Sequence, residues 1–220
     1  MTAPNEPKTV DPAVRILDEI KRRQRPLIIG IAIIIVGVGA IWYMSSAAER
    51  RENFAMTLLT NARTAAASGN VALAITDLSD LALSHRGTTA SEEAQVLLAQ
   101  LRISEGQAGL AVQELNGFID RGPSDQFRAP AHGLLAVALE QTGAAAESAS
   151  EYIAAADAAW YDFLEAQYLL EAARVLVATG DTTQAVSVYE RIMNDLSETD
   201  MVMEARLRLS EILKSDIDNR

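Results

Sequence analysis

The sequence contains no cysteine among its 220 residues. The chain therefore has no disulfide, no thiolate ligand for a metal, no cysteine nucleophile and no cysteine that could carry a lipid. Because a chain without cysteine suits either side of a bacterial inner membrane, the compartment has to be inferred from other features of the sequence.

Aromatic residues are also scarce, at 5% of the chain, whereas Ala and Leu are abundant. Small and flexible residues let helices pack closely, while sheet cores favour β-branched and aromatic side chains. We therefore expect an all-α fold. A chain of this length is long enough for one domain with a sizeable core.

Residues typical of catalysis and metal binding are sparse. The two histidines, His85 and His132, have no partner at ligand spacing, so we predict no metal site. We expect His85 to cap the end of a helix and His132 to take the packing place of an aromatic residue. The sequence has no glycine-rich phosphate loop, no G-x-S-x-G and no H-E-x-x-H. We therefore expect no enzymatic activity and no cofactor.

Charged residues are absent from the stretch LIIGIAIIIVGVGAIWYM, Leu27 to Met44. At about 1.5 Å per residue, a helix over this stretch is about 27 Å long, close to the ~30 Å hydrocarbon thickness of a bilayer. Trp42 and Tyr43 stand where an interfacial aromatic belt would lie. The stretch therefore predicts a transmembrane helix over residues 27–44.

The charges that flank this stretch predict its orientation. Four basic residues precede it, namely Lys21, Arg22, Arg23 and Arg25, while acidic and basic residues cancel after it. The positive-inside rule then places residues 1–26 in the cytoplasm as a basic, partly disordered tail. Residues 45–220 would form a periplasmic or otherwise extracytoplasmic domain of an inner-membrane protein. Pro26 favours a break in the helix before the anchor.

A cleavable signal peptide is the alternative to a retained anchor. The small residues Ser45–Ala48 offer a cleavage site after Ala48. However, the apolar run is longer than the roughly 7–15 residues of a usual signal core, and a long tail precedes it. We therefore favour a retained single-pass anchor.

Net charge differs between the two parts of the chain. Residues 1–44 carry six basic and four acidic residues, net +2, whereas residues 45–220 carry 13 basic and 26 acidic residues, net −13. An acidic domain disfavours nucleic acid as a partner. Plain solubility is the simplest explanation of this charge.

Four glycines recur with a period of 37 residues. A small residue lies seven positions before each glycine and another lies five positions after it, and sustained agreement of this kind indicates repeats. The repeat-defining residues are Ala62, Gly69, Ala74, Ala99, Gly106, Ala111, Ala136, Gly143, Ser148, Ala173, Gly180 and Ala185.

Each copy of the repeat predicts a pair of helices. The glycine ends the first helix in the left-handed conformation, and the two small residues let the paired helices approach each other. The polar residue after the glycine can cap the second helix, as Asn70, Gln107 and Asp181 would, whereas Ala144 caps poorly. We expect helices over 50–67, 71–84, 91–104, 108–121, 128–141, 144–157, 163–178, 182–196 and 201–214. The last of these is expected to be a solvating cap.

This pattern of small residues around a glycine resembles the tetratricopeptide repeat. The usual period of that family is about 34 residues, so a period of 37 implies a longer turn between copies. The resemblance covers about residues 50–214. It implies an α-solenoid of four helical hairpins with a C-terminal capping helix. An unrelated array of α-hairpins remains the alternative.

The layout of a short basic tail, one anchor and a repeat domain also resembles the YfgM-type ancillary subunit of the bacterial Sec translocon. This resemblance rests on architecture rather than on a motif. It implies a place beside the translocon, where the protein would hand emerging chains to periplasmic chaperones.

Stacked hairpins create a concave face that the first helices line. The residues expected there form an apolar ladder with polar edges, which suits a peptide or a helix. They are Leu59, Arg63, Val96, Gln100, Ile103, Val137, Leu170, Arg174, Val177 and Leu207. The alternative is that neighbouring first helices pack on each other through these residues.

Taken together, the sequence predicts a membrane-anchored scaffold that binds proteins of the bacterial envelope, the translocon or its chaperones. It contacts the bilayer through residues 27–44. The alternatives are a fixed structural or assembly subunit of an inner-membrane complex and, least favoured, an enzyme.

Overall fold

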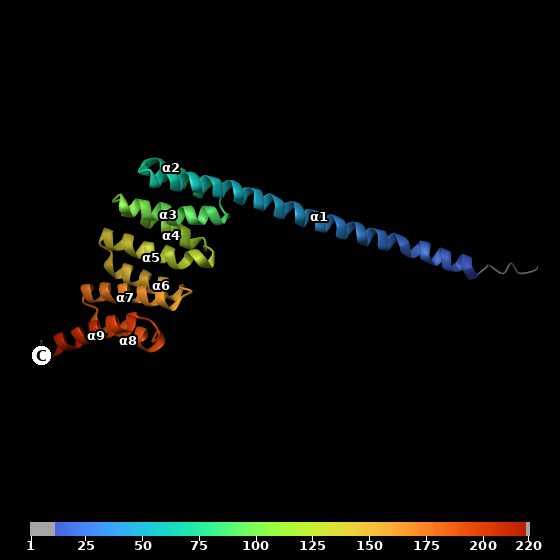
Figure 1. Ribbon diagram of the computed structural model, residues 1–220. Coiled ribbons are helices and arrows are strands. Elements are labelled where there is room, and N and C mark those ends of the chain that lie inside the picture. The colour runs from blue at the N-terminus through green and yellow to red at the C-terminus, as the bar shows by residue number, and fades with distance from the viewer. Residues whose placement is uncertain (1–11, 219–220) are drawn as a thin grey trace, which may run out of the picture. The chain divides into compact units, whose positions relative to one another are not determined.

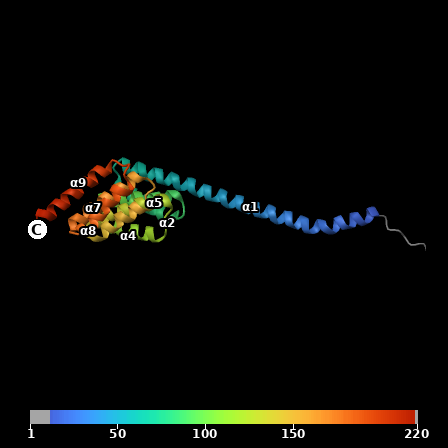
Figure 2. The same cartoon turned by 90° about the horizontal axis from the view of Figure 1, so that it is seen from below.

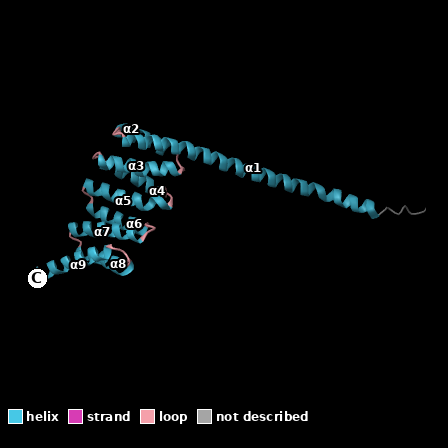
Figure 3. Ribbon diagram, viewed as in Figure 1, coloured by secondary structure: helices cyan, strands magenta, loops and turns pink. Residues whose placement is uncertain are grey.

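The computed structural model describes the backbone of residues 12–218 and the side chains of residues 30, 33–40 and 42–214. Within these residues there are nine helices and no strand (Figure 1, Figure 3). The helices are α1 (Pro12–Ala67), α2 (Val71–Ser84), α3 (Thr89–Ser104), α4 (Ala108–Asp120), α5 (Asp125–Thr142), α6 (Ala145–Asp157), α7 (Asp162–Thr179), α8 (Thr182–Asp195) and α9 (Met201–Asp218). The chain divides into two compact units, Met1–Arg50 and Arg51–Arg220.

In the first unit, α1 is helical on both sides of Pro26, so the break predicted there is absent. A proline removes one hydrogen bond from a helix, while the bonds of the other turns can persist. No helix within the described residues carries a stretch long and apolar enough to cross a membrane. Of the predicted anchor, positions 27–29, 31, 32 and 41 lie outside the described side chains. Residues 1–11 of the tail that was predicted to be partly disordered lie outside the described residues.

In the second unit, the helices stack in chain order, each against the next, from α2 to α9 (Figure 1, Figure 2). The first helices of successive pairs also meet, since α3 contacts α5 and α7 contacts α9. The end of α1 provides the first helix of the first pair, because its Ala55, Leu59 and Ala62 lie in one core cluster with residues of α2 and α3. The predicted all-helical solenoid is thus confirmed.

The glycine at the end of each first helix has the predicted left-handed conformation. Gly143 and Gly180 have φ angles of 84° and 85°. After Gly143, the backbone N–H of Ala144 donates to the carbonyl of Leu139 at 2.9 Å, which closes a Schellman cap. The N–H of Gly143 itself donates to the carbonyl of Glu140 at 3.0 Å. Equivalent pairs of backbone hydrogen bonds end the first helix of the other repeats, at Gly69, Gly106 and Gly180. These caps fix the turn inside every hairpin.

The small residues around the glycines lie in the contact between paired helices. All eight are completely buried, namely Ala62, Ala74, Ala99, Ala111, Ala136, Ser148, Ala173 and Ala185. Four positions beyond the second set, Leu78, Leu115, Tyr152 and Tyr189 fill the core between pairs. Small side chains here let the backbones approach, and the larger ones fill the space that remains.

The predicted caps of the second helices are confirmed in two copies. The side chains of Asn70 and Asp181 accept the N–H groups of Leu73 and Gln184, at 3.3 and 3.0 Å. Gln107 makes no such bond at the start of α4, contrary to the prediction, because its side chain accepts a hydrogen bond from Arg102 instead. At α6, the corresponding residue is alanine, which has no side-chain acceptor.

Candidate functional site

The predicted apolar ladder changes character along the solenoid. Leu59 is completely buried and Val96 is 8% exposed, so neither is available on a concave surface. In the first two repeats, the neighbouring first helices pack on each other through these residues, which was the alternative considered for this face. By contrast, Val177 is 39% and Leu207 is 57% exposed, and Leu170 is half-buried. The exposed part of the ladder therefore lies in α7 and α9.

A groove between α7, α8 and α9, here called the C-terminal groove, has a volume of about 920 Å³. Apolar side chains on its walls and floor are Leu170, Val177, Tyr189, Met201 and Ile212. Charged side chains of both signs line it as well, namely Glu171, Arg174, Glu204, Arg208 and Glu211. The groove thus contains three residues that the sequence predicted for a binding face, Leu170, Arg174 and Val177.

Hydrogen bonds hold Arg174 in place at this groove. Its guanidinium donates to both carboxylate oxygens of Glu140 at 2.8 Å and to Glu171 at 2.7 Å. The hydrogen bond to Glu140 raises the pKa of Arg174, despite the opposing effect of its burial. Glu140 also accepts the hydroxyl of Tyr152 at 2.9 Å. This network joins α5, α6 and α7, so the guanidinium reaches the groove already oriented.

The buried end of this network is Tyr152. Burial raises the pKa of its hydroxyl, and the hydrogen bond to Glu140 raises it further. The phenol therefore stays protonated and serves as a donor to Glu140 over the physiological range.

The other predicted groove residues do not gather at one place. Arg63 forms an ion pair with Glu93 of the neighbouring first helix. Gln100 is exposed on α3, while Ile103 and Val137 pack partly against two different core clusters. These residues therefore lie in the first three repeats, away from the walls of the C-terminal groove.

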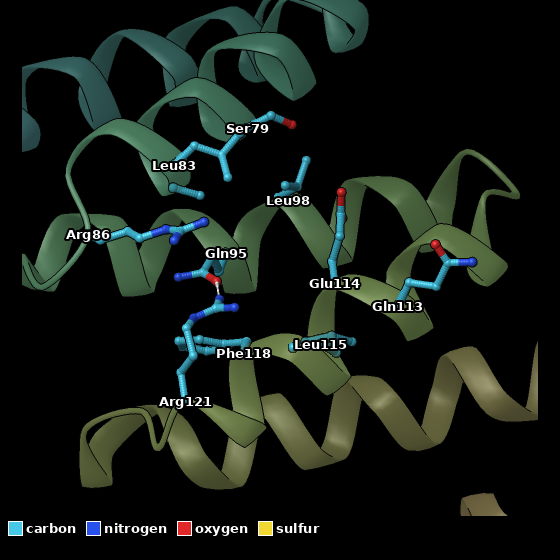
Figure 4. Close-up of a pocket in the computed structure, with 12 residues that line it drawn as sticks. Ser79, Leu83, Arg86, Gln95, Leu98, Gln113, Glu114, Leu115, Phe118 and Arg121 are labelled. Atoms are coloured by element: carbon cyan, nitrogen blue, oxygen red, sulfur yellow. Dashed lines mark hydrogen bonds between the residues drawn. The ribbon is translucent and has the colours of Figure 1, made fainter.

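A second pocket, of about 190 Å³, opens on the side of the second helices, between α2, α3 and α4. Figure 4 shows Leu98, Leu115 and Phe118 at its base and Arg86 and Arg121 at one end. Arg121 donates to the side chain of Gln95 there. No pattern in the sequence predicts this pocket, because its residues come from three separate helices and from the turns that follow two of them.

The two histidines take structural places. His85 lies at the end of α2, as predicted, where its backbone N–H donates to Leu81 and its ring lies 5.5 Å from that of Phe54. His132 does more than pack, because its Nδ1 lies 2.6 Å from a carboxylate oxygen of Glu151 on α6. Within the described residues, no group of three or more side chains could hold a metal ion.

Sequence reasoning overlooked one exposed aromatic segment. The run Trp160-Tyr161-Asp162-Phe163 spans the end of the turn before α7 and the first two residues of that helix, and its three rings are all exposed. The signal that could have identified it is the concentration of three aromatic residues within four positions of a chain that has few.

Among the solved structures that share this fold are the following two. One is described as "MamA 41-end from Desulfovibrio magneticus RS-1", at 18% identity and a TM-score of 0.52, covering 66% of this chain and 77% of that one. The other is described as "Crystal structure of Podosopora anserina putative kinesin light chain nearly identical TPR-like repeats", at 17% identity and a TM-score of 0.57, covering 74% of this chain and 87% of that one. At such identities the likeness shows the fold alone.

No curated protein matches the sequence. The family model described as Tetratricopeptide repeat-like domain matches residues 21–206, which include all four glycine-centred repeats and the start of α9. The chain therefore belongs to the tetratricopeptide repeat-like domain family.

Proposed function

We propose that this protein is a non-enzymatic scaffold that binds a segment of another protein in its C-terminal groove. The observation that carries the proposal is a groove of about 920 Å³ with both apolar and charged side chains on its walls. Exposed apolar side chains that are grouped and rimmed by polar ones are typical of binding surfaces. The repeat fold supports the same function, because stacked helical hairpins present extended surfaces to proteins.

The lining of the groove indicates the chemistry of the segment. Leu170, Val177 and Ile212 offer contacts to apolar anchors, as in the docking of an amphipathic helix. Arg174 and Arg208 lie beside Glu171, Glu204 and Glu211, so the rim can pair with charges of either sign. A segment with apolar anchors at helical spacing and charged residues beside them fits this lining.

We also propose that residues 27–44 anchor the protein in the bacterial inner membrane. Support comes from the uncharged sequence and from its described side chains, because Ile33, Ile34, Ile35, Val36 and Val38 are each more than 60% exposed. Apolar area exposed to water costs about 25 cal/mol per Å², a cost that a bilayer would remove. The flanking charges support a cytoplasmic N-terminus and an extracytoplasmic repeat domain.

The resemblance to the YfgM-type translocon subunit supports a finer proposal, in which the repeat domain receives chains beside the Sec translocon and passes them to chaperones. A fixed structural subunit of an inner-membrane complex is the second candidate. Detergent pull-down separates the two. Many transient clients support the first, and one stoichiometric set of partners supports the second.

Site-specific crosslinking in intact cells tests the groove. A photoreactive phenylalanine analogue would replace Val177, which lines the groove, or Leu207, beside the groove residue Arg208 on α9. Ala146 and Leu110 on second helices are the matched exposed controls. We expect protein adducts at the first two positions, identified by mass spectrometry. Equal adducts at all four positions would contradict a role of the groove.

A reporter fusion tests the anchor independently. An enzyme that is active only outside the cytoplasm would be fused after Arg220, and we expect activity. An inactive fusion, together with activity of a reporter that works only in the cytoplasm, would contradict the proposed topology. A mature N-terminus near Glu49 would show that the segment is a cleaved signal.

A further inference from the structure

The turn before α7 and the first residues of that helix expose a large share of the aromatic surface of this chain. Trp160, Tyr161 and Phe163 are 65%, 60% and 52% exposed, although the whole sequence has only two Trp, five Tyr and four Phe residues. An aromatic side chain can bury about 150–250 Å². Three of them left in water at one turn form an apolar patch that core packing does not explain.

A second turn forms the other wall of this patch. Residues 198–200, which precede α9, and Met201, its first residue, line a hollow of about 580 Å³ together with residues 160–163. The rings of Tyr161 and Phe163 stack at a centroid distance of 5.9 Å. The carbonyl of Tyr161 accepts the N–H groups of Leu164 and Glu165 at 2.9 and 3.0 Å, so the start of α7 holds this turn rigidly. We call this surface the aromatic hollow.

The charges in the aromatic hollow are all negative. Asp162, Glu198 and Asp200 line it, and no basic side chain does. None of the three forms an ion pair within the described part of the chain. Arg191, on the neighbouring α8, is held by Asp157 and Glu165 instead. Negative carboxylates beside exposed π-faces attract a cation through charge and through the ring quadrupole.

We propose that the aromatic hollow docks a basic segment of a partner protein, with an arginine or lysine on the aromatic faces and apolar residues beside it. Charge complementarity carries the choice of partner. A second copy of this chain would bring its own negative domain, which carries a net charge of −13, and an anionic membrane surface would be repelled. Met201 is the one residue that lines both this surface and the C-terminal groove, and the contacts proposed for the aromatic hollow do not involve it, so the inference does not depend on the proposed function.

The test uses the full chain with Trp42→Phe, reconstituted in zwitterionic phospholipid, because Trp160 is then the only tryptophan. The probe is an acetylated peptide of alternating leucine and arginine, and the matched control replaces arginine with its neutral analogue citrulline. We expect saturable quenching of Trp160, about three- to thirtyfold weaker with citrulline, as a cation–π contact predicts.

Variants locate the contact. We expect Tyr161→Ala with Phe163→Ala to weaken peptide binding about tenfold, and Glu198→Gln with Asp200→Asn to weaken it two- to fivefold and reduce its salt dependence. Leu110→Ala removes another exposed apolar side chain, on α4, and should leave binding unchanged. Melting temperatures should stay close to that of the parent, because the altered side chains are exposed.

Three results would overturn the proposal. The first is the lack of saturable quenching by the arginine peptide. The second is that the parent protein binds the citrulline peptide as tightly as the arginine peptide, or that the Tyr161→Ala, Phe163→Ala variant binds the arginine peptide as tightly as the parent does. The third is quenching of Trp160 by brominated acyl chains in the bilayer, which would assign the aromatic patch to the lipid surface.

Discussion

Ser148 places a hydroxyl where the other three repeats have the methyl group of an alanine. Its side chain is completely buried and its oxygen has no hydrogen-bond partner. Leaving a buried polar group unpaired costs about 1–3 kcal/mol. The three equivalent alanines, Ala74, Ala111 and Ala185, show that this contact needs only a small side chain.

Replacing Ser148 by alanine should therefore stabilise the domain. The change keeps the backbone and the Cβ but removes the unpaired hydroxyl, so we expect the free energy of unfolding to rise by about 1–2 kcal/mol. Urea unfolding followed by circular dichroism measures it. The exposed Ser150→Ala on the same helix is the control and should change little. A loss of stability in Ser148→Ala would mean that the hydroxyl is paired after all.

Tyr152 links stability to pH at the same repeat. Its pKa is raised above the ordinary value of 10.0 by burial and by its hydrogen bond to Glu140. Because the folded pKa is the higher one, the contribution of Tyr152 to stability is complete below pH 10 and is lost as pH rises through the folded pKa. Tyr152→Phe removes the hydroxyl, and with it both the hydrogen bond to Glu140 and the group that titrates.

We expect Tyr152→Phe to cost about 1–2 kcal/mol at neutral pH and to flatten the loss of stability between pH 10 and pH 11. Urea midpoints at pH 7, 10 and 11 provide the measurement. Tyr161→Phe, which alters an exposed ring, is the control and should follow the parent. If the urea midpoint of Tyr152→Phe falls between pH 10 and pH 11 as steeply as that of the parent, the raised pKa of Tyr152 does not contribute to the pH dependence of stability.

At the scale of the elements, the hairpin contact depends on side-chain volume. Ala136 is completely buried between α5 and its neighbours, whereas Ala146 is exposed on α6. Ala136→Leu should overpack the contact and cost about 1–3 kcal/mol, while Ala146→Leu should cost far less. Thermal unfolding of the two variants compares them directly. Equal shifts in melting temperature would contradict the register of the repeats.

The helices and their pairing could be predicted from the sequence, because each glycine and each small residue acts through contacts within one hairpin. The openness of the concave face could not. Whether this face is open depends on how closely neighbouring hairpins stack. Apolar residues are equally suitable for lining an open groove and for packing in a closed contact, so their presence does not distinguish the two. At Gly133, for example, an added Cβ would lie 2.6 Å from the ring of Tyr168, which shows that α5 and α7 are already in contact there.

The same limit explains why the candidate groove was only partly predicted. Its α7 residues Leu170, Arg174 and Val177 follow the repeat. Tyr189 comes from α8, a second helix that the pattern did not assign to a binding face, and Met201 and Ile212 lie on α9, where the pattern had assigned Leu207 alone. The capping helix behaves as predicted in one respect, since Arg206, Arg208, Glu211 and Lys214 are exposed. Ser210, at the position where the other copies bury an alanine, is exposed too.

For the molecule as a whole, the ladder runs from a closed stack in the first repeats to an open groove at α7 and α9. The position that holds Leu59 in the first repeat holds Leu207 in the last helix, 57% exposed. Stability and binding should therefore be separable along one line of equivalent residues. Two substitutions at that repeat position, Val96→Ser and Leu207→Ser, test this separation.

Val96→Ser puts a hydroxyl into the core cluster of the second and third repeats, so we expect a loss of about 2–3 kcal/mol in the free energy of unfolding. Leu207→Ser changes an exposed side chain next to the C-terminal groove and should leave the melting temperature nearly unchanged. It should, however, reduce crosslinking of partners through Val177, because a lost apolar contact of about 1–2 kcal/mol lowers affinity roughly five- to thirtyfold. If Leu207→Ser folds like the parent and every Val177 adduct persists at full yield, partners bind elsewhere. If Leu207→Ser instead melts as low as Val96→Ser, α9 closes the stack as the earlier first helices do, and the groove is part of the core.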